Sequence, residues 1–249
     1  MGSAATQIPQ PLVRTAVSVQ IWDSVFAPPT KIARAVALTA ACLALVATAA
    51  QAGAGWSFKP PAKDGPAAKF FESGGWEEQR GSWDSWRFRN GALHTYQDDD
   101  STLVGRKVSI DPKATPILRF SFEVKQHPRG ADLRRKDTED SALRIFVVFD
   151  RGGGLFSPPD SIAYAFGNPA IKGRAITSER FDNVKYMVVA GGRAQLGRRI
   201  EIERNLAKDY RRAFGRAAPR IQAIGIKSDS NNLDAKAQAI VHGIAVTAR

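Results

Sequence analysis

The chain has 249 residues, of which 36 are Lys or Arg and 24 are Asp or Glu, so its formal net charge is +12. A hydrophobic content of 43% is ordinary for a globular protein and excludes global disorder. The single cysteine, Cys42, excludes an intramolecular disulfide framework and any zinc site built on several cysteines. The three histidines show no metal-ligand spacing.

The first 52 residues are predicted to form a secretory signal peptide with an extended leader. Lys31 and Arg34 precede an apolar run over residues 35–50, and small residues at Ala50 and Ala52 follow where a signal peptidase cuts. The run is rich in alanine and therefore weakly hydrophobic, so we favour cleavage after Ala52 over retention as a membrane anchor. We expect an exported protein, periplasmic or secreted, that contacts the membrane only through this signal segment.

The rest of the chain is predicted to be an all-β domain over residues 67–249, preceded by a Gly- and Pro-rich linker over residues 53–66. Leu118 and Phe120 alternate with Arg119 and Ser121, as expected for a strand buried on one face. Turn signals separate this segment from further apolar segments at residues 143–149, 184–189, 199–203, 221–226 and 237–246. Such spacing indicates a sandwich or barrel, and we favour an antiparallel β-sandwich of the jelly-roll, galactose-binding-like kind.

One segment differs from this pattern. Asn205 is a helix-capping residue, Gly215 is a typical helix terminator, and Leu206, Tyr210 and Phe214 recur every four residues between them. The segment predicts one short amphipathic helix that lies across a sheet edge or the mouth of the sandwich.

Candidate catalytic residues are few, because the sequence contains no nucleophile elbow, phosphate-binding loop or dinucleotide-binding motif. Glu201 and Glu203 are two apart on a predicted strand, so both point to one face. With Asp140 they are the candidates for acid and base work on a glycan. The alternative, which we favour, is a solvated sheet face, because alternation alone produces this pattern.

Arg144 lies in the most apolar predicted strand and needs a carboxylate partner, because an unpaired buried guanidinium costs several kcal/mol. Asp140, Asp150 and Asp209 are the candidate partners. The arginine either forms the base of an anion or sugar pocket or ties the strand to the helix through an ion pair. We favour the second interpretation.

Two further groups are candidates for ligand binding. Trp83 and Trp86 belong to an aromatic cluster that fits stacking on sugar rings, although core packing is the more common role for such residues. Asp229 and Asn231 belong to an oxygen-rich loop that fits calcium, although Asx-rich turns of this kind usually bind no metal.

Basic residues are concentrated in residues 129–136 and 193–216. Clusters of this kind attract anionic polymers or lipid surfaces. Nucleic acid is not an expected partner of an exported protein, and acidic residues interleave with the second cluster.

Three motifs in order resemble an uncharacterised exported bacterial family, the domain of unknown function DUF3047. They are residues 139–149, 205–215 and 228–232, and the resemblance covers about residues 70–248. The residues that match the family pattern are Glu139 and Asp140 before the strand arginine, Asp209 and Tyr210 in the helix, and Asp229, Asn231 and Asn232 in the last loop. The chain departs from that pattern at Arg198 or Arg199, where the family commonly has Trp, and near Leu233, where it has Thr. The resemblance implies an exported β-sandwich and supplies no activity.

Together these observations favour an exported, non-catalytic binding protein for a carbohydrate or an anionic cell-envelope polymer. The predicted ligand-binding residues are Trp83, Trp86, Asp140, Arg144 and Asp209, and no cofactor is expected apart from calcium. A glycan-cleaving enzyme and a structural envelope protein are the alternatives.

Overall fold

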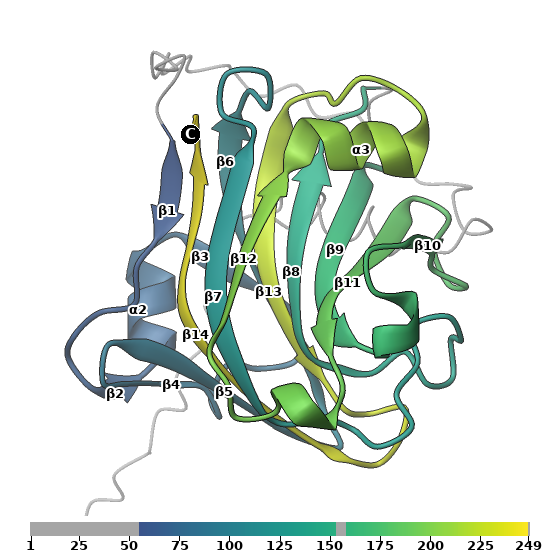
Figure 1. Cartoon of the computed structure of the whole chain (residues 1–249). Coiled ribbons are helices and arrows are strands. Elements are labelled where there is room, and N and C mark those ends of the chain that lie inside the picture. Colours follow the sequence, from purple (N-terminus) through teal and green to yellow (C-terminus); the bar gives the residue numbers. More distant parts are fainter. Residues whose placement is uncertain (1–54, 153–157, 249) are drawn as a thin grey trace, which may run out of the picture.

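The computed structural model describes residues 55–152 and 158–248, which form two β-sheets packed face to face (Figure 1). The predicted β-sandwich is therefore confirmed. The signal peptide predicted over residues 1–52 lies outside the described residues.

The first sheet contains seven strands, and all its pairings are antiparallel. In spatial order they are β12 (Ile200–Asn205), β7 (Ile117–Gln126), β14 (Lys236–Thr247), β5 (Ala92–Asp98), β4 (Arg87–Arg89) and β2 (Gly65–Pro66), with β1 (Trp56–Phe58) paired to one end of β14.

The second sheet also contains seven strands. In spatial order they are β10 (Ala175–Thr177), β11 (Val184–Gly191), β9 (Asp160–Gly167), β8 (Ser141–Phe149), β13 (Ile221–Asp229), β6 (Ser101–Ile110) and β3 (Trp76–Arg80). The pair β9–β11 is parallel, which departs from the purely antiparallel prediction. A parallel pair needs a crossover connection. Here residues 168–183 supply it, with the short 3-10 helix η2 (Pro169–Ile171) and strand β10 inside it.

The main core lies between the sheets. On β7 the predicted alternation holds, because Leu118 and Phe120 are buried in this core while Arg119 and Ser121 face outward. A second, smaller apolar cluster covers the outer face of the second sheet, where Phe146 and Val148 are buried. Strands β8 and β9 are thus buried on both faces, which explains why their sequences are almost continuously apolar.

The linker predicted over residues 53–66 is incorrect from Trp56 onward. Trp56–Phe58 pairs with β14, and Gly65–Pro66 pairs with β4. Phe58 is buried among aromatic side chains, including that of Phe71 on a six-residue helix, α2 (Ala68–Ser73), which the sequence did not predict. The strands and the helix here are too short to leave a periodic signal, so the Gly and Pro content dominated the prediction.

The amphipathic helix is confirmed as α3 (Leu206–Phe214), which crosses one end of the sandwich (Figure 1). The Asn205 side chain accepts a hydrogen bond from the backbone N–H of Lys208, at 2.9 Å, and Gly215 ends the helix with a φ of 72°. A second 3-10 helix, η3 (Arg193–Gln195), precedes β12. In the described ranges, no helix has both the length and the apolar character needed to cross a membrane.

Candidate functional site

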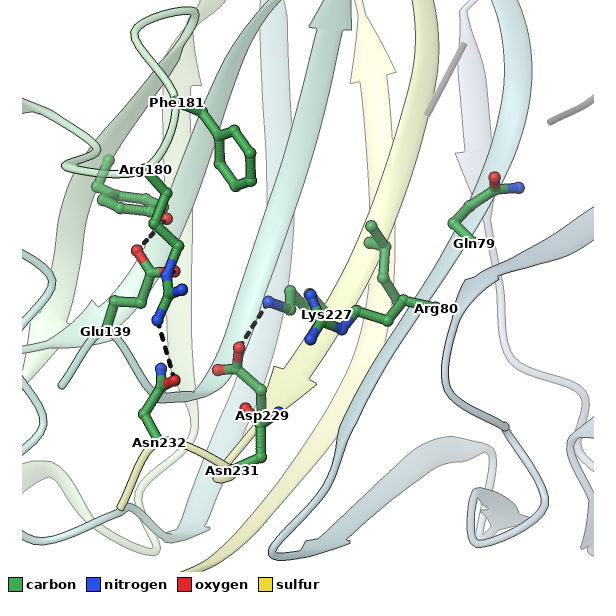
Figure 2. A pocket seen from close by; sticks show the side chains of 11 residues that line it. Gln79, Arg80, Glu139, Arg180, Phe181, Lys227, Asp229, Asn231 and Asn232 are labelled. Atoms are coloured by element: carbon green, nitrogen blue, oxygen red, sulfur yellow. Dashed lines mark hydrogen bonds and ion pairs between the residues drawn. The ribbon is translucent and has the colours of Figure 1, made fainter. Parts of the chain in front are cut away.

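A cavity of about 400 Å³ opens on the outer face of the second sheet (Figure 2). Its lining comes from the sheet, from the segment before β8, from the crossover and from the loop after β13. The lining residues are Gln79, Arg80, Leu103, Glu139, Arg180, Phe181, Tyr186, Lys227, Asp229, Asn231 and Asn232. This volume lies within the range of small-molecule sites in proteins.

Strand register explains the floor of the cavity. Arg80 of β3 lies opposite Leu103 of β6, Leu103 lies opposite Lys227 of β13, and Lys227 lies opposite Arg144 of β8. Directly opposed residues point to the same face of a sheet, so this row presents three cations to the outer face.

Asp229 neutralises the two buried cations of this row. Its carboxylate accepts a hydrogen bond and forms an ion pair with Arg144, and its Oδ2 lies 2.6 Å from Nζ of Lys227. The Arg144 and Asp229 side chains are only 1% and 2% exposed. Burial alone would raise the pKa of Asp229, but the positive charges of Arg144 and Lys227 hold it below its usual range. Arg144 therefore has a carboxylate partner as expected, although Asp140, Asp150 and Asp209 were the wrong candidates.

Lys227 is a base at the cavity whose pKa is shifted by its surroundings. Burial, followed by the positive charge of Arg144, lowers the pKa of its ammonium group to about 8, although Asp229 opposes the shift. Its side chain is 9% exposed and lines the cavity. The contact with the carboxylate of Asp229 favours the charged form of this lysine and offsets part of the effect of burial.

A second charge network forms the wall nearest the crossover. The hydroxyl group of Tyr186 donates a hydrogen bond to Oε2 of Glu139, at 3.1 Å, and Nε of Arg180 lies 2.6 Å from Oε1 of the same carboxylate. Arg180 also donates a hydrogen bond to Oδ1 of Asn232, at 3.2 Å, so it joins the crossover to the last loop (Figure 2). Burial raises the pKa of Tyr186 to about 12, so its hydroxyl group stays protonated.

Asp140 positions the loop after β13. Its carboxylate accepts hydrogen bonds from the backbone N–H groups of Asn232, at 3.1 Å, and Leu233, at 3.0 Å. Burial and the negative charge of Asp229 raise its pKa. Its carboxylate is thus directed at the backbone, and it fixes the loop that carries Asn231 and Asn232.

The tryptophan prediction was wrong. Trp83 and Trp86 are 7% and 0% exposed and belong to the main core. Trp83 stacks on Phe71 with ring centroids 5.4 Å apart. Neither ring presents a face to a ligand, because each is buried by the aromatic side chains around α2.

Asp209 also lies away from the cavity. It is a buried residue of α3, where it accepts a hydrogen bond from the hydroxyl group of Tyr164, at 2.9 Å, and pairs with Arg204 of β12, at 2.5 Å. The predicted ion pair between a strand and the helix therefore exists. Arg204 of β12 forms it with Asp209, whereas the prediction assigned it to Arg144.

Glu201 and Glu203 share one face of β12, as predicted, and that face is exposed. Their side chains are 81% and 61% accessible, and Glu203 pairs with Arg119 at 2.8 Å. They line a shallow surface on the first sheet, whereas Asp140 is placed at the second sheet. The three candidate catalytic carboxylates therefore do not converge in one cleft.

The calcium prediction for Asp229 and Asn231 is also incorrect. The Asp229 carboxylate is already neutralised by Arg144 and Lys227, and two adjacent cations oppose the binding of a third. Across residues 55–152 and 158–248, no group of three or more His, Cys, Asp and Glu residues is arranged to hold a metal ion.

Five lining residues of the cavity were not predicted from the sequence, namely Arg80, Arg180, Phe181, Tyr186 and Lys227. Lys227 had a detectable signal, because a lysine on an otherwise apolar strand next to Ile226 requires an acidic partner. Arg180 and Phe181 lie in the crossover and had none, because nothing local indicates which face of a sheet a loop covers.

The chain resembles some solved structures weakly and matches one protein family. Among solved structures, a sialidase aligns with 13% identity and a TM-score of 0.41. The alignment covers 74% of this chain but only 18% of the sialidase. A winged bean acidic lectin complexed with methyl-alpha-D-galactose aligns with 12% identity and a TM-score of 0.37, over 78% of this chain and 99% of the lectin. No curated protein matches the sequence. The family of proteins of unknown function DUF3047 matches residues 78–245, and the chain belongs to that family.

Proposed function

We propose that the protein is an exported, non-catalytic binding protein for a carbohydrate of the cell envelope or its surroundings, and that the cavity on the second sheet is the binding site. The observation that carries this proposal is the combination of Phe181, which is half-exposed, with amide and charged side chains around one cavity of about 400 Å³.

The chemistry of the lining suits a sugar. The apolar C–H face of a sugar ring stacks on an aromatic ring, and Phe181 stands beside the cavity in Figure 2. Asn231 and Asn232 offer amide donors and acceptors for hydroxyl groups, and Gln79 offers a third amide from the opposite side. Ligand sites commonly combine an apolar surface with a few fixed polar groups of this kind.

The rigid surroundings of the cavity support binding at low entropic cost. Arg180 is held by Glu139 and Asn232, and the last loop is held by Asp140. Because these side chains already have partners, a ligand meets a largely ordered surface.

The direct test is a thermal-shift screen of the protein against neutral and acidic envelope and plant glycans, followed by calorimetry on each hit. A ligand at a hundredfold excess over its dissociation constant adds about 2.7 kcal/mol to the free energy of unfolding. We expect at least one glycan to stabilise the wild-type protein, and Phe181→Ala to weaken its binding at least tenfold.

Tyr96→Ala is the matched control, because Tyr96 is a half-buried aromatic residue on the outer face of the first sheet. Binding that depends on Tyr96 and not on Phe181 would place the site on the first sheet and contradict the proposal. A screen in which no glycan stabilises the protein would favour the structural-protein alternative.

Export is the second part of the proposal and has a separate test. Expression of the full chain in a Gram-negative bacterium should yield a periplasmic or secreted product that begins at Gly53. A product that keeps residues 1–52 and stays with the membrane would instead support an uncleaved anchor.

A further inference from the structure

The cavity carries more positive than negative charge. Asp229 is shared by Arg144 and Lys227, and Glu139 is taken by Arg180. One carboxylate therefore forms the ion pairs of two buried cations, and Glu139 adds an attraction to both of them through space. Nearby, the carboxylate of Asp140 accepts hydrogen bonds from the backbone of the last loop and is not aimed at either cation.

Arg80 adds a further positive charge at the mouth of the cavity. It is exposed at the end of β3, and in Figure 2 its side chain extends across the sheet toward Lys227. Leu103 lies between the two residues in the strand register and provides an apolar floor. Among the described residues, no carboxylate forms an ion pair with Arg80.

We infer that the carbohydrate bound here is acidic, and that its carboxylate or sulfate group binds between Arg80 and Lys227. This inference rests on the proposed function and specifies its ligand class. A guanidinium group binds a planar carboxylate or a sulfate through two parallel hydrogen bonds, and an ammonium group adds a compact positive charge.

The physical reason is that the buried positive charge of Arg144 and Lys227 is unfavourable in the absence of a ligand. Two cations that share one carboxylate in a partly desolvated site are incompletely neutralised, and burying such charge is unfavourable. An anionic ligand group adds the negative charge that is lacking at Lys227 and forms an ion pair with Arg80. A neutral sugar would leave both charges as they are, so the site should discriminate by charge as well as by shape.

The test compares acidic glycans with neutral counterparts of the same backbone. The probes are an oligogalacturonate and its methyl ester, and a sulfated oligosaccharide and its desulfated form. Calorimetry should show at least one acidic member binding at least tenfold more tightly than its neutral counterpart.

The variants are Arg80→Gln and, as a control of equal charge change, Arg87→Gln, which alters an exposed arginine of β4 on the first sheet. Arg80→Gln should remove most of the preference for the acidic member, and Arg87→Gln should keep it. Equal losses in the two variants would show nonspecific attraction to a basic protein and would overturn the inference.

Two other outcomes separate this inference from the proposed function. Equal affinity for acidic and neutral members, with both lost in Phe181→Ala, would retain the carbohydrate site and reject the acidic ligand. Stabilisation by inorganic sulfate that depends on Arg80 and equals that by the sulfated glycan would show a site for a free anion. Failure of every glycan to bind would contradict the proposed function itself and this inference with it.

Discussion

Lys227 and Arg144 lie directly opposite each other on neighbouring strands of the second sheet, and both form ion pairs with the same carboxylate. Like charges at directly opposed positions of a sheet are destabilising unless something neutralises them. Asp229 does so from the end of β13, and its Oδ1 also accepts a hydrogen bond from the backbone N–H of Ser141, at 2.9 Å. A single buried carboxylate thus holds the floor of the cavity together.

Removal of Arg144 should strongly destabilise the fold. Arg144→Met breaks a fully buried pair and removes the main partner of Asp229, for which we expect a loss of about 3–5 kcal/mol in the free energy of unfolding, measured by urea denaturation. Arg119→Met is the matched control, because Arg119 pairs with Glu203 at an exposed site, and it should cost less than about 1 kcal/mol. Equal effects of the two substitutions would contradict the assigned role of Asp229.

Trp86→Ala should lower stability and should not selectively remove ligand binding. Trp86 is fully buried beside Phe71, so its truncation leaves a large cavity and should cost about 3–5 kcal/mol. Phe181→Ala, at a half-exposed position, should cost about 1 kcal/mol. Chemical denaturation of both variants distinguishes the two roles. A Trp86→Ala protein of near wild-type stability would mean that the indole ring is not part of the core.

Trp83 and Trp86 were predicted to bind a ligand because the burial of an aromatic ring depends on distant parts of the chain. Alternation on β7 and the caps of α3 are local patterns, and both were predicted correctly. Whether Trp86 faces a core or a ligand depends on α2, whose Phe71 contacts its ring, and a helix of six residues leaves no periodic signal in the sequence. Local sequence therefore predicted several strands, β7 among them, and could not predict what covers them.

The candidate site was predictable only in part, for the same reason. The acidic residues around Arg144 indicated a buried charge, but the pairing with Asp229 follows from strand register across 85 positions of sequence separation. Arg180 and Phe181 reach the site because the crossover between the parallel strands β9 and β11 folds over the outer face. No periodic pattern in the crossover indicates that path.

His127 should make the fold sensitive to mild acid. Burial, followed by the positive charge of Arg144, lowers its pKa to about 4, below the value of about 6.5 for an unfolded chain. Between these values the unfolded state binds the extra proton, so stability falls as pH decreases from 6.5 to 4, by up to about 1.4 kcal/mol per pH unit. Unfolding free energies of His127→Gln should show a shallower decline over this range. Parallel pH profiles for the two proteins would show that His127 does not contribute.

Replacing the exposed carboxylates of β12 should have little effect. The double substitution Glu201→Gln and Glu203→Gln removes two solvated charges on the first sheet, so the free energy of unfolding should change by no more than about 0.5 kcal/mol. Glycan affinity measured by calorimetry should also be unchanged. A loss of glycan binding in this variant would move the site to the first sheet and reopen the glycan-cleaving alternative.

The central claim is that carbohydrate binds on the outer face of the second sheet, and hydrogen–deuterium exchange tests it most directly. The protein would be compared with and without the glycan that stabilises it most in the thermal-shift screen. We predict slower exchange in residues 177–183 and 226–233, two segments that contain lining residues of the cavity, and unchanged exchange in residues 85–96 of the first sheet. Protection confined to residues 85–96, or no protection in either sheet, would contradict this account.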